Sequence, residues 1–448
     1  MPVNENIGEH PAKVLREKIY NRSAKVSIIG LGYVGLPLAV EQAKIGFPVL
    51  GIDLDSCKVK HINNGKSYIR DVAGEDIFKL VEGGRLKASS QFDNIKEADV
   101  IIICVPTPLK SMRVPDLSFV LSATREVANQ IKKGQLISLE STTFPGTTQE
   151  VILPILEASG LTVGSDFFLS FSPERVDPGN KYYTTRDISK VVGGVTPLCR
   201  EMASTFYSQG LKQVVPVSSP ATAEMTKIFE NTYRSVNIAL VNEFMILCDR
   251  MNIDVWEVVE AAATKPFGIQ TFFPGPGVGG HCIPVDPVYL AWKAKDFDFH
   301  TRFIDLAEEI NMQASEHVVK KLISVLNRQK KCLNGSRILI LGITYKKDID
   351  DVRESPALKI IDYLNKNQAE VVYYDPYVPR FQLSSENDKY MESISISEEE
   401  LAKADSVLIL TDHSCIEYQW VVDHAKLILD ARNATKKVQR GKEKITKI

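Results

Sequence analysis

The 448-residue sequence lacks the features that mark several large classes of protein. Its 54 lysines and arginines do not outnumber its 56 aspartates and glutamates, so no basic excess indicates a nucleic acid or an anionic membrane as partner. No apolar run reaches the roughly 18 residues that a membrane span needs. The opening residues, MPVNENIGEH, contain no apolar segment of the kind found in secretory signals. We therefore expect neither nucleic-acid binding nor membrane insertion.

Cysteine is also scarce, and the seven cysteines show no paired spacing. The odd number and the absence of any Cys-x-x-Cys argue against a disulfide framework and against a zinc site, so no metal is expected. We interpret six of them as small core hydrophobes with reduced thiols. These six are Cys57, Cys104, Cys199, Cys248, Cys332 and Cys415. Reduced thiols and the missing signal segment together predict a cytoplasmic protein.

Short apolar runs of strand length alternate with segments of helical period in both halves of the chain. The runs are residues 25–29, 48–52, 99–105 and 136–139 in the first half, and 337–341, 370–374, 406–410 and 427–429 in the second. Strands that alternate with helices and are apolar throughout are typical of parallel sheets covered on both faces. The sequence thus predicts an α/β protein with two Rossmann-like doubly wound domains. A weak internal echo, EADVIIICVPT at 97–107 and KADSVLILTDH at 403–413, favours the same organisation.

The middle of the chain has a helical pattern. Residues 221–252 carry apolar side chains at helical spacing and contain no proline or glycine, which predicts one long helix, and a second helix is expected at 305–327. The predicted divisions are an N-terminal extension at 1–23, a first domain at 24–217, a central helical domain at 218–328 and a last domain at 329–448. The long helix either carries a homodimer interface or only links the domains, and we expect the homodimer.

A Gly-x-Gly-x-x-Gly pattern, Gly30-Leu31-Gly32-Tyr33-Val34-Gly35, lies between a predicted strand and a predicted helix. Asp53 ends the next strand, about 20 residues further on, as in dinucleotide-binding folds. Gly30 permits the tight turn, Gly32 lets the backbone approach a pyrophosphate, and Gly35 lets the helix lie close to the strand. The helix N-terminus offers free N–H groups to the phosphates. Because a carboxylate at Asp53 repels a 2′-phosphate, the pattern predicts NAD rather than NADP.

The second half of the chain has no such fingerprint. Gly342-Ile343-Thr344-Tyr345 follows its first strand instead. A Rossmann-like fold without the glycines suits a different nucleotide, held by side chains such as Lys346, Arg353 and Arg432. An alternative is a salt-bridged domain interface, in which Lys346 and Arg353 pair with the neighbouring acidic residues Asp348, Asp350, Asp351 and Glu354.

Two further segments carry candidate catalytic residues. Residues 272–286 are rich in glycine and proline, which predicts a shaped loop that delivers Cys282, with Asp286 four residues on. A cysteine there can be a nucleophile if its thiolate is favoured, although a structural turn with a buried thiol explains the bare pattern equally well. Lys227 and Asn231 are four residues apart and share one face of the long helix, in a polar stripe with Glu224 and Arg234; a solvated helix face is the alternative.

The sequence resembles the UDP-glucose/GDP-mannose dehydrogenase family from about residue 25 to residue 433. The motifs occur in the family order: Gly30-Leu-Gly-Tyr-Val-Gly-Leu-Pro37, Val105-Pro-Thr-Pro108, Glu140-Ser-Thr-Thr-Phe-Pro-Gly146, Ser172-Pro-Glu-Arg175, Lys227 with Asn231, Gly279-Gly-His-Cys282 with Asp286, and Lys346-Lys-Asp with Asp351-Val-Arg-Glu-Ser-Pro356. The resemblance implies an oxidation by two NAD⁺ at C6 of a nucleotide sugar. It also implies that residues 24–217 bind NAD and that residues 329–448 bind a UDP-sugar.

The resemblance assigns roles to individual residues. Cys282 forms a thiohemiacetal and then a thioester with the sugar carbon, Lys227 stabilises the developing oxyanion, and Asn231 donates a hydrogen bond. Asp286 and Thr143 position water or relay protons, and Glu174 acts in thioester hydrolysis. The expected cofactor-binding residues are Gly30, Gly32, Tyr33, Val34, Gly35, Asp53, Pro106, Thr107, Thr142 and Arg353. The expected substrate-binding residues are Glu174, Arg175, Lys227, Asn231, Phe273, Gly275, Gly279, Lys346 and Arg432.

The choice of sugar rests on finer likenesses. The UDP-glucose branch carries a second carboxylate after its glutamate, whereas Glu174 is followed here by Arg-Val-Asp-Pro-Gly. This departure argues against glucose, and Thr264-Lys-Pro-Phe-Gly268 resembles the UDP-N-acetylglucosamine 6-dehydrogenase type. UDP-N-acetylmannosamine, UDP-N-acetylgalactosamine and UDP-glucose stay as alternative substrates, and the uronate product suits surface polysaccharide synthesis. A two-electron hydroxyacid dehydrogenase, or an NAD-binding protein without catalysis, is a less favoured reading.

Overall fold

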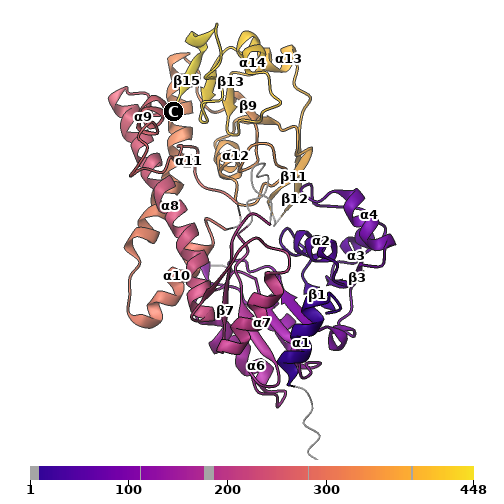
Figure 1. Ribbon diagram of the computed structural model, residues 1–448. Coiled ribbons are helices and arrows are strands. Elements are labelled where there is room, and N and C mark those ends of the chain that lie inside the picture. The colour runs from indigo at the N-terminus through magenta and orange to yellow at the C-terminus, as the bar shows by residue number, and fades with distance from the viewer. Residues whose placement is uncertain (1–9, 111–112, 176–185, 281, 385–386) are drawn as a thin grey trace, which may run out of the picture. The chain divides into compact units, whose positions relative to one another are not determined.

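The computed structural model describes residues 10–110, 113–175, 186–280, 282–384 and 387–448. The chain forms two compact units (Figure 1). One consists of residues 1–230 and 288–297, and the other of residues 231–287 and 298–448. The helix α8, Pro220–Met251, is 32 residues long, begins in the first unit and continues in the second. Within the described residues, no helix is both long and apolar enough to cross a membrane.

The first unit contains an eight-stranded sheet with the order β3-β2-β1-β4-β5-β6-β7-β8. Its strands are β1 (Val26–Ile29), β2 (Val49–Ile52), β3 (Leu86–Ser89), β4 (Val100–Ile103), β5 (Leu136–Leu139), β6 (Phe168–Phe171), β7 (Lys190–Gly194) and β8 (Val214–Val217). All neighbours pair in parallel except β6 and β7, which are antiparallel. Every residue of β1, β4, β5 and β6 is buried, which explains the unbroken apolar runs.

Helices cover both faces of this sheet. They are α1 (Pro11–Tyr20), α2 (Gly35–Ile45), α3 (Ser56–Asn63), α4 (Gly74–Glu82), the 3₁₀ turn Ile95–Glu97, α5 (Ser118–Ala128), the π-helical segment Thr147–Ile152 that continues into α6 (Leu153–Glu157), and α7 (Pro197–Tyr207). Side chains of α1, α2 and α7 share one core with Ile28 and Ile102, whereas α5 and α6 share the other with Ile29 and Ile103. Consecutive strand residues therefore feed opposite layers, as the pleat requires.

The N-terminal extension is helical in its described part. The side chain of His10 accepts a hydrogen bond from the backbone N–H of Ala12 and caps α1. Leu15 and Ile19 are buried in the first core, and Lys18 Nζ lies 2.7 Å from Asp99 Oδ1. Residues 11–20 are thus part of the first unit, while residues 1–9 lie outside the described range.

The second unit contains a five-stranded parallel sheet with the order β10-β9-β13-β14-β15 and a separate antiparallel hairpin, β11 with β12. The strands are β9 (Arg337–Leu341), β10 (Glu370–Tyr374), β11 (Arg380–Ser384), β12 (Asn387–Glu392), β13 (Ser406–Ile409), β14 (Ile428–Asp430) and β15 (Ile445–Lys447). The remaining helices are α9 (Val255–Ala262), α10 (Asp286–Ala294), the 3₁₀ turn Lys295–Phe297, α11 (Arg302–Arg328), α12 (Pro356–Lys366), α13 (Glu398–Lys403), α14 (Tyr418–His424) and the 3₁₀ turn Lys442–Lys444. Of these, α10 and the turn after it lie mostly in the first unit.

The predicted fold class is confirmed. All eight predicted strands are present within two residues of their expected ends, and α8 and α11 coincide with the two predicted helices. Helices α11 and α12 share a core with one face of the second sheet, and α13 and α14 share a core with the other. The hairpin β11–β12 and the edge strand β15 were not predicted.

The weak internal echo corresponds to a repeated construction. Asp99 Oδ2 accepts a hydrogen bond of 2.9 Å from the backbone N–H of Lys25, just before β1. Asp405 Oδ2 accepts one of 2.9 Å from the backbone N–H of Arg337, where β9 begins. Each aspartate precedes a buried strand and satisfies a donor at the entry of the neighbouring strand, where an orphan N–H would be costly.

The interpretation of the cysteines as core residues is half wrong. Cys104, Cys199 and Cys248 are buried, but Cys57, Cys332 and Cys415 are exposed. Cys57 lies in the first turn of α3, of which only Ile62 is buried, and the other two lie in turns outside regular elements. Their thiols are free, and a single small apolar side chain on a surface carries little cost.

Candidate active site

The predicted residues of the first unit gather at one edge of its sheet. Ile29, Ile52, Ile103, Leu139 and Phe171 are aligned in the parallel register and end their strands together. The segments that follow these ends carry the glycine turn, Asp53, Pro106 with Thr107, Thr142 with Thr143, and Glu174. In open α/β sheets, ligands bind outside the carboxyl ends of the strands.

The geometry of the glycine turn fits a dinucleotide. Gly30 has φ +93°, and a Cβ on it would lie 2.6 Å from Cys104 O; a Cβ on Gly35 would lie 1.8 Å from Gly30 O. Contacts within the protein therefore require glycine at both positions. A Cβ on Gly32, in contrast, would meet no described atom within 4 Å. There is thus open space beside the Gly32 backbone, and no side chain caps the adjacent N-terminus of α2, an arrangement that suits a phosphate group.

Asp53 is held by the turn that it faces. Its Oδ2 accepts a hydrogen bond of 2.9 Å from the backbone N–H of Leu31, and its Oδ1 accepts one of 2.9 Å from that of Asp55. Lys58 Nζ lies 3.2 Å from Oδ2. Tyr68, which the sequence did not single out, donates from its hydroxyl to Leu31 O at 2.6 Å. Burial, with Asp53 adding a smaller effect, raises the pKa of Tyr68, so this hydroxyl stays a donor.

The loop after β5 contains an orphaned hydroxyl. Thr142 and Thr143 are both buried, and Thr143 Oγ1 has no hydrogen-bond partner among the described residues. Buried polar groups are bonded in the great majority of cases, so this hydroxyl indicates a place for a ligand or a water molecule. On the neighbouring loop, the carbonyl of Thr107 accepts a hydrogen bond of 3.1 Å from the hydroxyl of Tyr289.

Glu224 on α8 anchors that same loop. Its carboxylate is fully buried and accepts three hydrogen bonds: 2.6 Å from Gly146 N, 2.9 Å from Thr148 N and 2.7 Å from Thr148 Oγ1. Burial raises the pKa of Glu224. The predicted polar stripe is thus not uniform, because Glu224 is buried whereas Arg234 is exposed. Lys227 is 6% exposed, and its ammonium group has no hydrogen-bond or ion-pair partner among the described residues.

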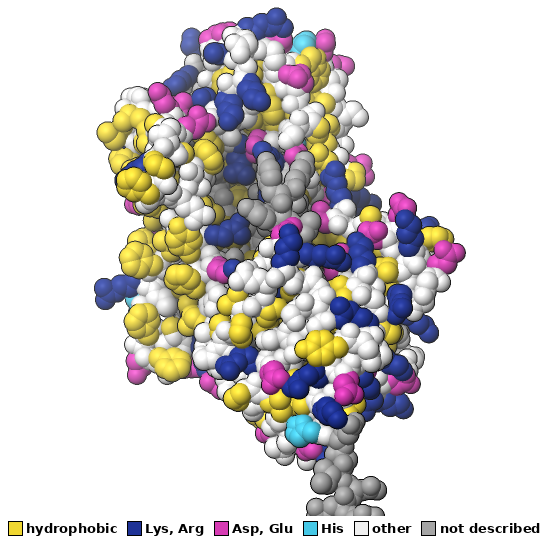
Figure 2. Space-filling view, viewed as in Figure 1, with side chains coloured by type: hydrophobic (Ala, Val, Ile, Leu, Met, Phe, Trp, Pro, Cys, Tyr) yellow, Lys and Arg dark blue, Asp and Glu magenta, His cyan; other side chains and the backbone are white. Residues whose placement is uncertain are grey.

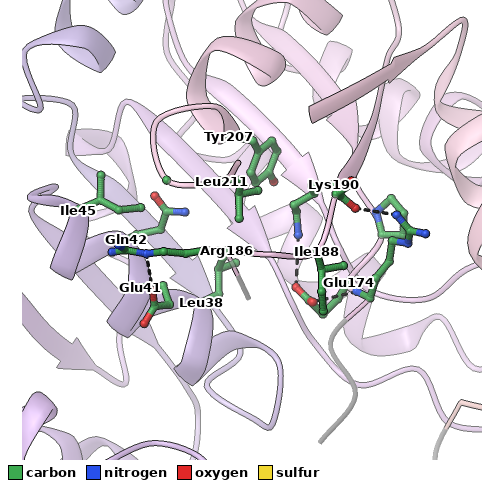
Figure 3. A pocket seen from close by; sticks show the side chains of 14 residues that line it. Leu38, Glu41, Gln42, Ile45, Glu174, Arg186, Ile188, Lys190, Tyr207 and Leu211 are labelled. Atoms are coloured by element: carbon green, nitrogen blue, oxygen red, sulfur yellow. Dashed lines mark hydrogen bonds and ion pairs between the residues drawn. The ribbon is translucent and has the colours of Figure 1, made fainter. Parts of the chain in front are cut away.

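Glu174 belongs to a buried cluster of charged side chains that sequence reasoning missed. Lys190, the first residue of β7, places Nζ 3.3 Å from Glu174 Oε2 (Figure 3). The same Nζ lies 2.8 Å from Glu140 Oε2. The hydroxyl of Tyr207 donates to Glu140 Oε1 at 2.6 Å and lies 2.8 Å from Ser138 Oγ. The sequence could not predict this cluster, because the contact of Lys190 with the two glutamates depends on the antiparallel pairing of β7 with β6.

Arg175 has protein partners in this structure. Its guanidinium pairs with Glu230 at 2.6 and 3.2 Å and donates to Ser189 O at 2.6 Å. Arg175 and Glu174 also line the hollow in Figure 3, together with Lys190, Gln42 and apolar residues of α2. None of the predicted cofactor-binding residues lines this hollow.

In the second unit, the structure brings three predicted catalytic residues together. Asn231 Nδ2 donates to Asp286 Oδ2 at 2.6 Å, and Asp286 is fully buried. The backbone N–H groups of Asp286 and Val285 donate to Cys282 O at 2.8 and 3.2 Å. Cys282 is partly exposed and stands one turn before α10, so its backbone is bonded to the residue that also holds the Asn231 amide. His281 lies outside the described residues.

The glycines of the loop before Cys282 make room for the C-terminal part of the chain. A Cβ on Gly275 would lie 2.4 Å from Arg432 Nη1, and one on Gly279 would lie 2.5 Å from the Cβ of Tyr345. The backbone N–H of Gly280 donates to Arg353 O at 3.0 Å. The loop was expected to let a ligand approach; at these positions it lets protein side chains approach. Phe273, half exposed, stacks on Trp256 at 6.1 Å between ring centroids.

The three predicted basic residues of the last domain differ in their surroundings. Arg353 forms an ion pair with Asp351 at 2.7 Å, which agrees with the salt-bridge alternative for this residue. Arg432 Nε lies 3.7 Å from Asp412 Oδ1. Lys346 is partly buried, and its carbonyl accepts a hydrogen bond of 2.9 Å from Thr344 Oγ1.

In the second sheet, Asp375 accepts backbone hydrogen bonds in the same pattern as Asp53, but its carboxylate also contacts a histidine. Asp375 ends β10 and accepts hydrogen bonds from Ile343 N at 2.8 Å and Tyr377 N at 2.9 Å, as Asp53 does from Leu31 and Asp55. Here the carboxylate is buried, and His413 Nε2 lies 3.1 Å from it. The carboxylate that follows the second strand is thus bonded within the protein by an imidazole in this half, whereas Asp53 in the first half is bonded by Lys58.

Comparison with known proteins matches all three parts of one family. Residues 24–211 match the NAD binding domain of the UDP-glucose/GDP-mannose dehydrogenase family, residues 221–313 its central domain and residues 339–437 its UDP binding domain. The chain is 36% identical over 424 residues to a UDP-N-acetyl-D-mannosamine dehydrogenase from Pyrococcus horikoshii, covering 93% of this chain and 97% of that one. It is 36% identical over 359 residues to a UDP-N-acetyl-D-glucosamine 6-dehydrogenase from Pseudomonas aeruginosa, covering 80% and 84%. A solved structure described as a UDP-D-ManNAc dehydrogenase from P. horikoshii superposes with a TM-score of 0.83 at 34% identity, covering 92% and 96%.

Proposed function

The chain belongs to the UDP-glucose/GDP-mannose dehydrogenase family, and from this premise we propose that it oxidises the C6 hydroxyl of UDP-N-acetylglucosamine to a carboxylate. That it is an NAD-dependent nucleotide-sugar dehydrogenase follows from the family and its relatives. The observation that carries the proposal is the accessible Cys282 beside the bonded pair Asn231–Asp286. A two-electron alcohol dehydrogenase has no need of a thiol at that place.

The proposed reaction removes four electrons. NAD⁺ supplies the hydride acceptor for both oxidations. Loss of a hydride and a proton turns the C6 alcohol into an aldehyde, and the Cys282 thiolate then forms a C–S bond while the oxygen takes a proton, giving a thiohemiacetal. Loss of a second hydride and proton gives a thioester. Attack of water on the carbonyl carbon breaks the C–S bond and releases the carboxylate, so one alcohol, two NAD⁺ and one water yield one carboxylate, two NADH and three protons.

The residues of this chain divide the work. Lys227, a buried ammonium group without a described partner, suits an oxyanion that develops on the substrate. Asn231 holds Asp286 at 2.6 Å, and this pair orients the proton acceptor near Cys282. Glu174 acts on the hydrolytic water, and Thr143, with its orphaned hydroxyl, donates to substrate or water. Gly32 and the N-terminus of α2 hold the pyrophosphate of NAD, and Asp53 holds the adenosine ribose.

The choice of N-acetylglucosamine is the finer part of the proposal. Relatives of similar identity carry the names of UDP-N-acetylglucosamine and UDP-N-acetylmannosamine enzymes. The likeness of Thr264–Gly268 to the N-acetylglucosamine type supports the first sugar. Phe267 in this segment is 71% exposed and lies under the Lys265 ammonium at 5.1 Å from the ring centroid. The uronate product would be a donor for surface polysaccharide.

We also propose a homodimer formed through α8. Six apolar residues on this helix are separated by steps of three, four or seven positions and are between 41% and 67% exposed: Phe229, Tyr233, Leu240, Phe244, Leu247 and Met251. Figure 2 shows hydrophobic side chains gathered over this helix. A stripe with this spacing is the seam along which two helices associate, and a second copy of the chain presents the same stripe to it.

The decisive experiment counts NADH released per sugar consumed. Limiting UDP-N-acetylglucosamine with excess NAD⁺ is followed by absorbance until the signal is constant. We expect two NADH per sugar from the wild type, and no turnover to the acid from Cys282→Ala. A ratio of one, or full acid formation by Cys282→Ala, refutes the thioester route. A ratio of two only with another UDP-sugar keeps the chemistry and changes the substrate.

A further inference from the structure

Lys190 occupies an unusual place at the carboxyl edge of the first sheet. It is 7% exposed, yet it carries a charge, and its ammonium group lies between two carboxylates that follow β5 and β6. The side chain of Glu140 is fully buried and that of Glu174 is 11% exposed. Such a group of ions is expensive to bury, and replacement by apolar residues is often neutral or stabilising. Stability alone therefore gives no reason for it.

The cluster is built so that Glu140 fixes one side of the Lys190 ammonium group and Glu174 lies on the other side. Glu140 receives the Lys190 ammonium at 2.8 Å and the Tyr207 hydroxyl at 2.6 Å, and Tyr207 is itself fully buried beside Ser138. Burial raises the pKa of Tyr207, which keeps its hydroxyl a donor to Glu140. At the other end, Lys190 reaches Glu174 at 3.3 Å. Figure 3 shows Lys190 extending from β7 to the Glu174 carboxylate.

We propose that Lys190, anchored by Glu140, is the positioning residue that orients Glu174 and keeps it ionised for attack of water on the Cys282 thioester. This inference rests on the proposed function, because it assigns Lys190 a part in the hydrolytic step. In that step the water oxygen forms a bond to the thioester carbon, a water proton passes to the Glu174 carboxylate, and the carbon–sulfur bond breaks to give the Cys282 thiolate. A carboxylic acid cannot take that proton, so the ionised form of Glu174 is required.

The charges around Glu174 decide the direction of the effect. Lys190 on β7 favours its ionised form, and Glu140 after β5 opposes it, since like charges at close range resist joint ionisation. The guanidinium group of Arg175, the next residue in sequence, forms an ion pair with Glu230 of α8, and this carboxylate largely offsets its positive charge. The Cys104 thiol after β4 is neutral, because burial raises its pKa. Among the described residues, Arg186 also lines the hollow beside Glu174, and Lys227 on α8 is close enough to lower the pKa of the Cys104 thiol by its charge, against the larger effect of burial.

The test separates the hydrolytic step from the oxidations. Enzyme is mixed with UDP-N-acetylglucosamine and NAD⁺, quenched in acid at intervals, and the acyl adduct on Cys282 is followed by intact-protein mass from pH 5 to pH 9. We expect Lys190→Gln to slow adduct decay at pH 7 at least about tenfold and to move the midpoint of decay upward by about one pH unit or more. Lys190→Arg, which keeps the charge, should restore decay to within a few-fold of the wild type.

The opposite perturbation gives an independent check. Glu140→Gln keeps Lys190 but removes the competing carboxylate, so the midpoint of decay should move downward. If Lys190→Gln does not fold, Glu140→Gln and Lys190→Arg together still test whether the charges of this cluster set the midpoint of decay. Lys293→Gln is the matched control, because Lys293 also forms an ion pair of 2.9 Å with a glutamate, Glu150, in the same unit. Its midpoint should equal that of the wild type.

The outcomes distinguish the two proposals. A wild-type chain that forms no adduct with any UDP-sugar refutes the proposed function and the role of Lys190 with it. An adduct in the wild type, combined with midpoints that are unmoved in Lys190→Gln and Glu140→Gln, refutes only the role of Lys190. A Lys190→Arg variant as slow as Lys190→Gln also contradicts it, because the proposal requires the charge rather than the lysine shape.

Discussion

A pair of glycine-to-alanine substitutions tests the assignment of the NAD site. In Gly32→Ala the new methyl group meets no described atom within 4 Å, and the backbone of Gly32 is not in the left-handed region. The free energy of unfolding should therefore stay the same or rise by about 0.4–1 kcal/mol, since alanine restricts the unfolded chain. A pyrophosphate against this backbone, however, would collide with the methyl group. We expect NAD to bind at least about tenfold more weakly, which is about 1.4 kcal/mol.

Gly35→Ala is the contrasting variant. Its methyl group would lie 1.8 Å from the carbonyl oxygen of Gly30 and 2.9 Å from the carbonyl carbon, both backbone atoms that cannot move aside cheaply. Overpacking of this kind costs about 1–3 kcal/mol, so we expect a lower midpoint of thermal unfolding even without ligand. The two substitutions add the same group three residues apart, and only one of them should disturb the fold.

Thermal unfolding is measured for each variant with and without NAD, and the dissociation constant by calorimetry. At a concentration of 100 times the dissociation constant, ligand should stabilise the wild type by about 2.7 kcal/mol. A tenfold weaker affinity leaves about 1.4 kcal/mol at the same NAD concentration, so about half of that gain or more should vanish in Gly32→Ala, while its unfolding without ligand matches the wild type. Wild-type affinity in Gly32→Ala would refute the placement of the pyrophosphate. Loss of stability in Gly32→Ala without ligand would show that the glycine serves the fold.

Three further predictions follow from the structure. Asn231→Asp places a second carboxylate 2.6 Å from that of Asp286, so the thermal midpoint should fall more at pH 8 than at pH 5; an equal loss at both would contradict the repulsion. Glu224→Ala leaves three donors around Gly146 and Thr148 without their acceptor, and chemical denaturation should show a loss of about 2–5 kcal/mol, whereas a loss below 1 kcal/mol would mean that water replaces the carboxylate. Leu240→Asp, on an exposed position of α8, should give a folded monomer by light scattering, and a persistent dimer would place the interface elsewhere.

Glu224 also imposes a pH dependence on stability. Its pKa is raised in the folded chain, so protonation favours the folded state: the contribution is present in full at acid pH and is lost as the pH rises through the folded pKa. The three hydrogen bonds to its carboxylate oppose this loss, because they favour the ionised form. Burial is the larger of the two effects.

Much of the fold could be predicted from the sequence, because the patterns that indicate its strands, its glycine turn and its long helix involve residues close together in the chain. A strand buried on both faces favours an apolar residue at every position, and β4 has one at each of its positions. The glycine turn and Asp53 are likewise readable, since the conformation at Gly30 and the close contact at Gly35 exclude other residues within a few positions of chain. The long helix α8 was visible from its period and its lack of breakers. Family motifs named the candidate site residues, but their roles remain predictions.

Only the tertiary structure decided which distant groups share a buried volume. Lys190 and Glu140 are 50 positions apart, and their contact exists because β7 runs antiparallel beside β6. Glu224 accepts hydrogen bonds from a turn 76 to 78 positions away. Cys57 is exposed, and the residue type alone did not indicate whether this cysteine would face the core or the solvent. Hydrophobic periodicity and backbone preference act over a few residues, so they can be recognised in the sequence. The partner of a buried charge is chosen by strand order and register, which arise only when the whole sheet has formed.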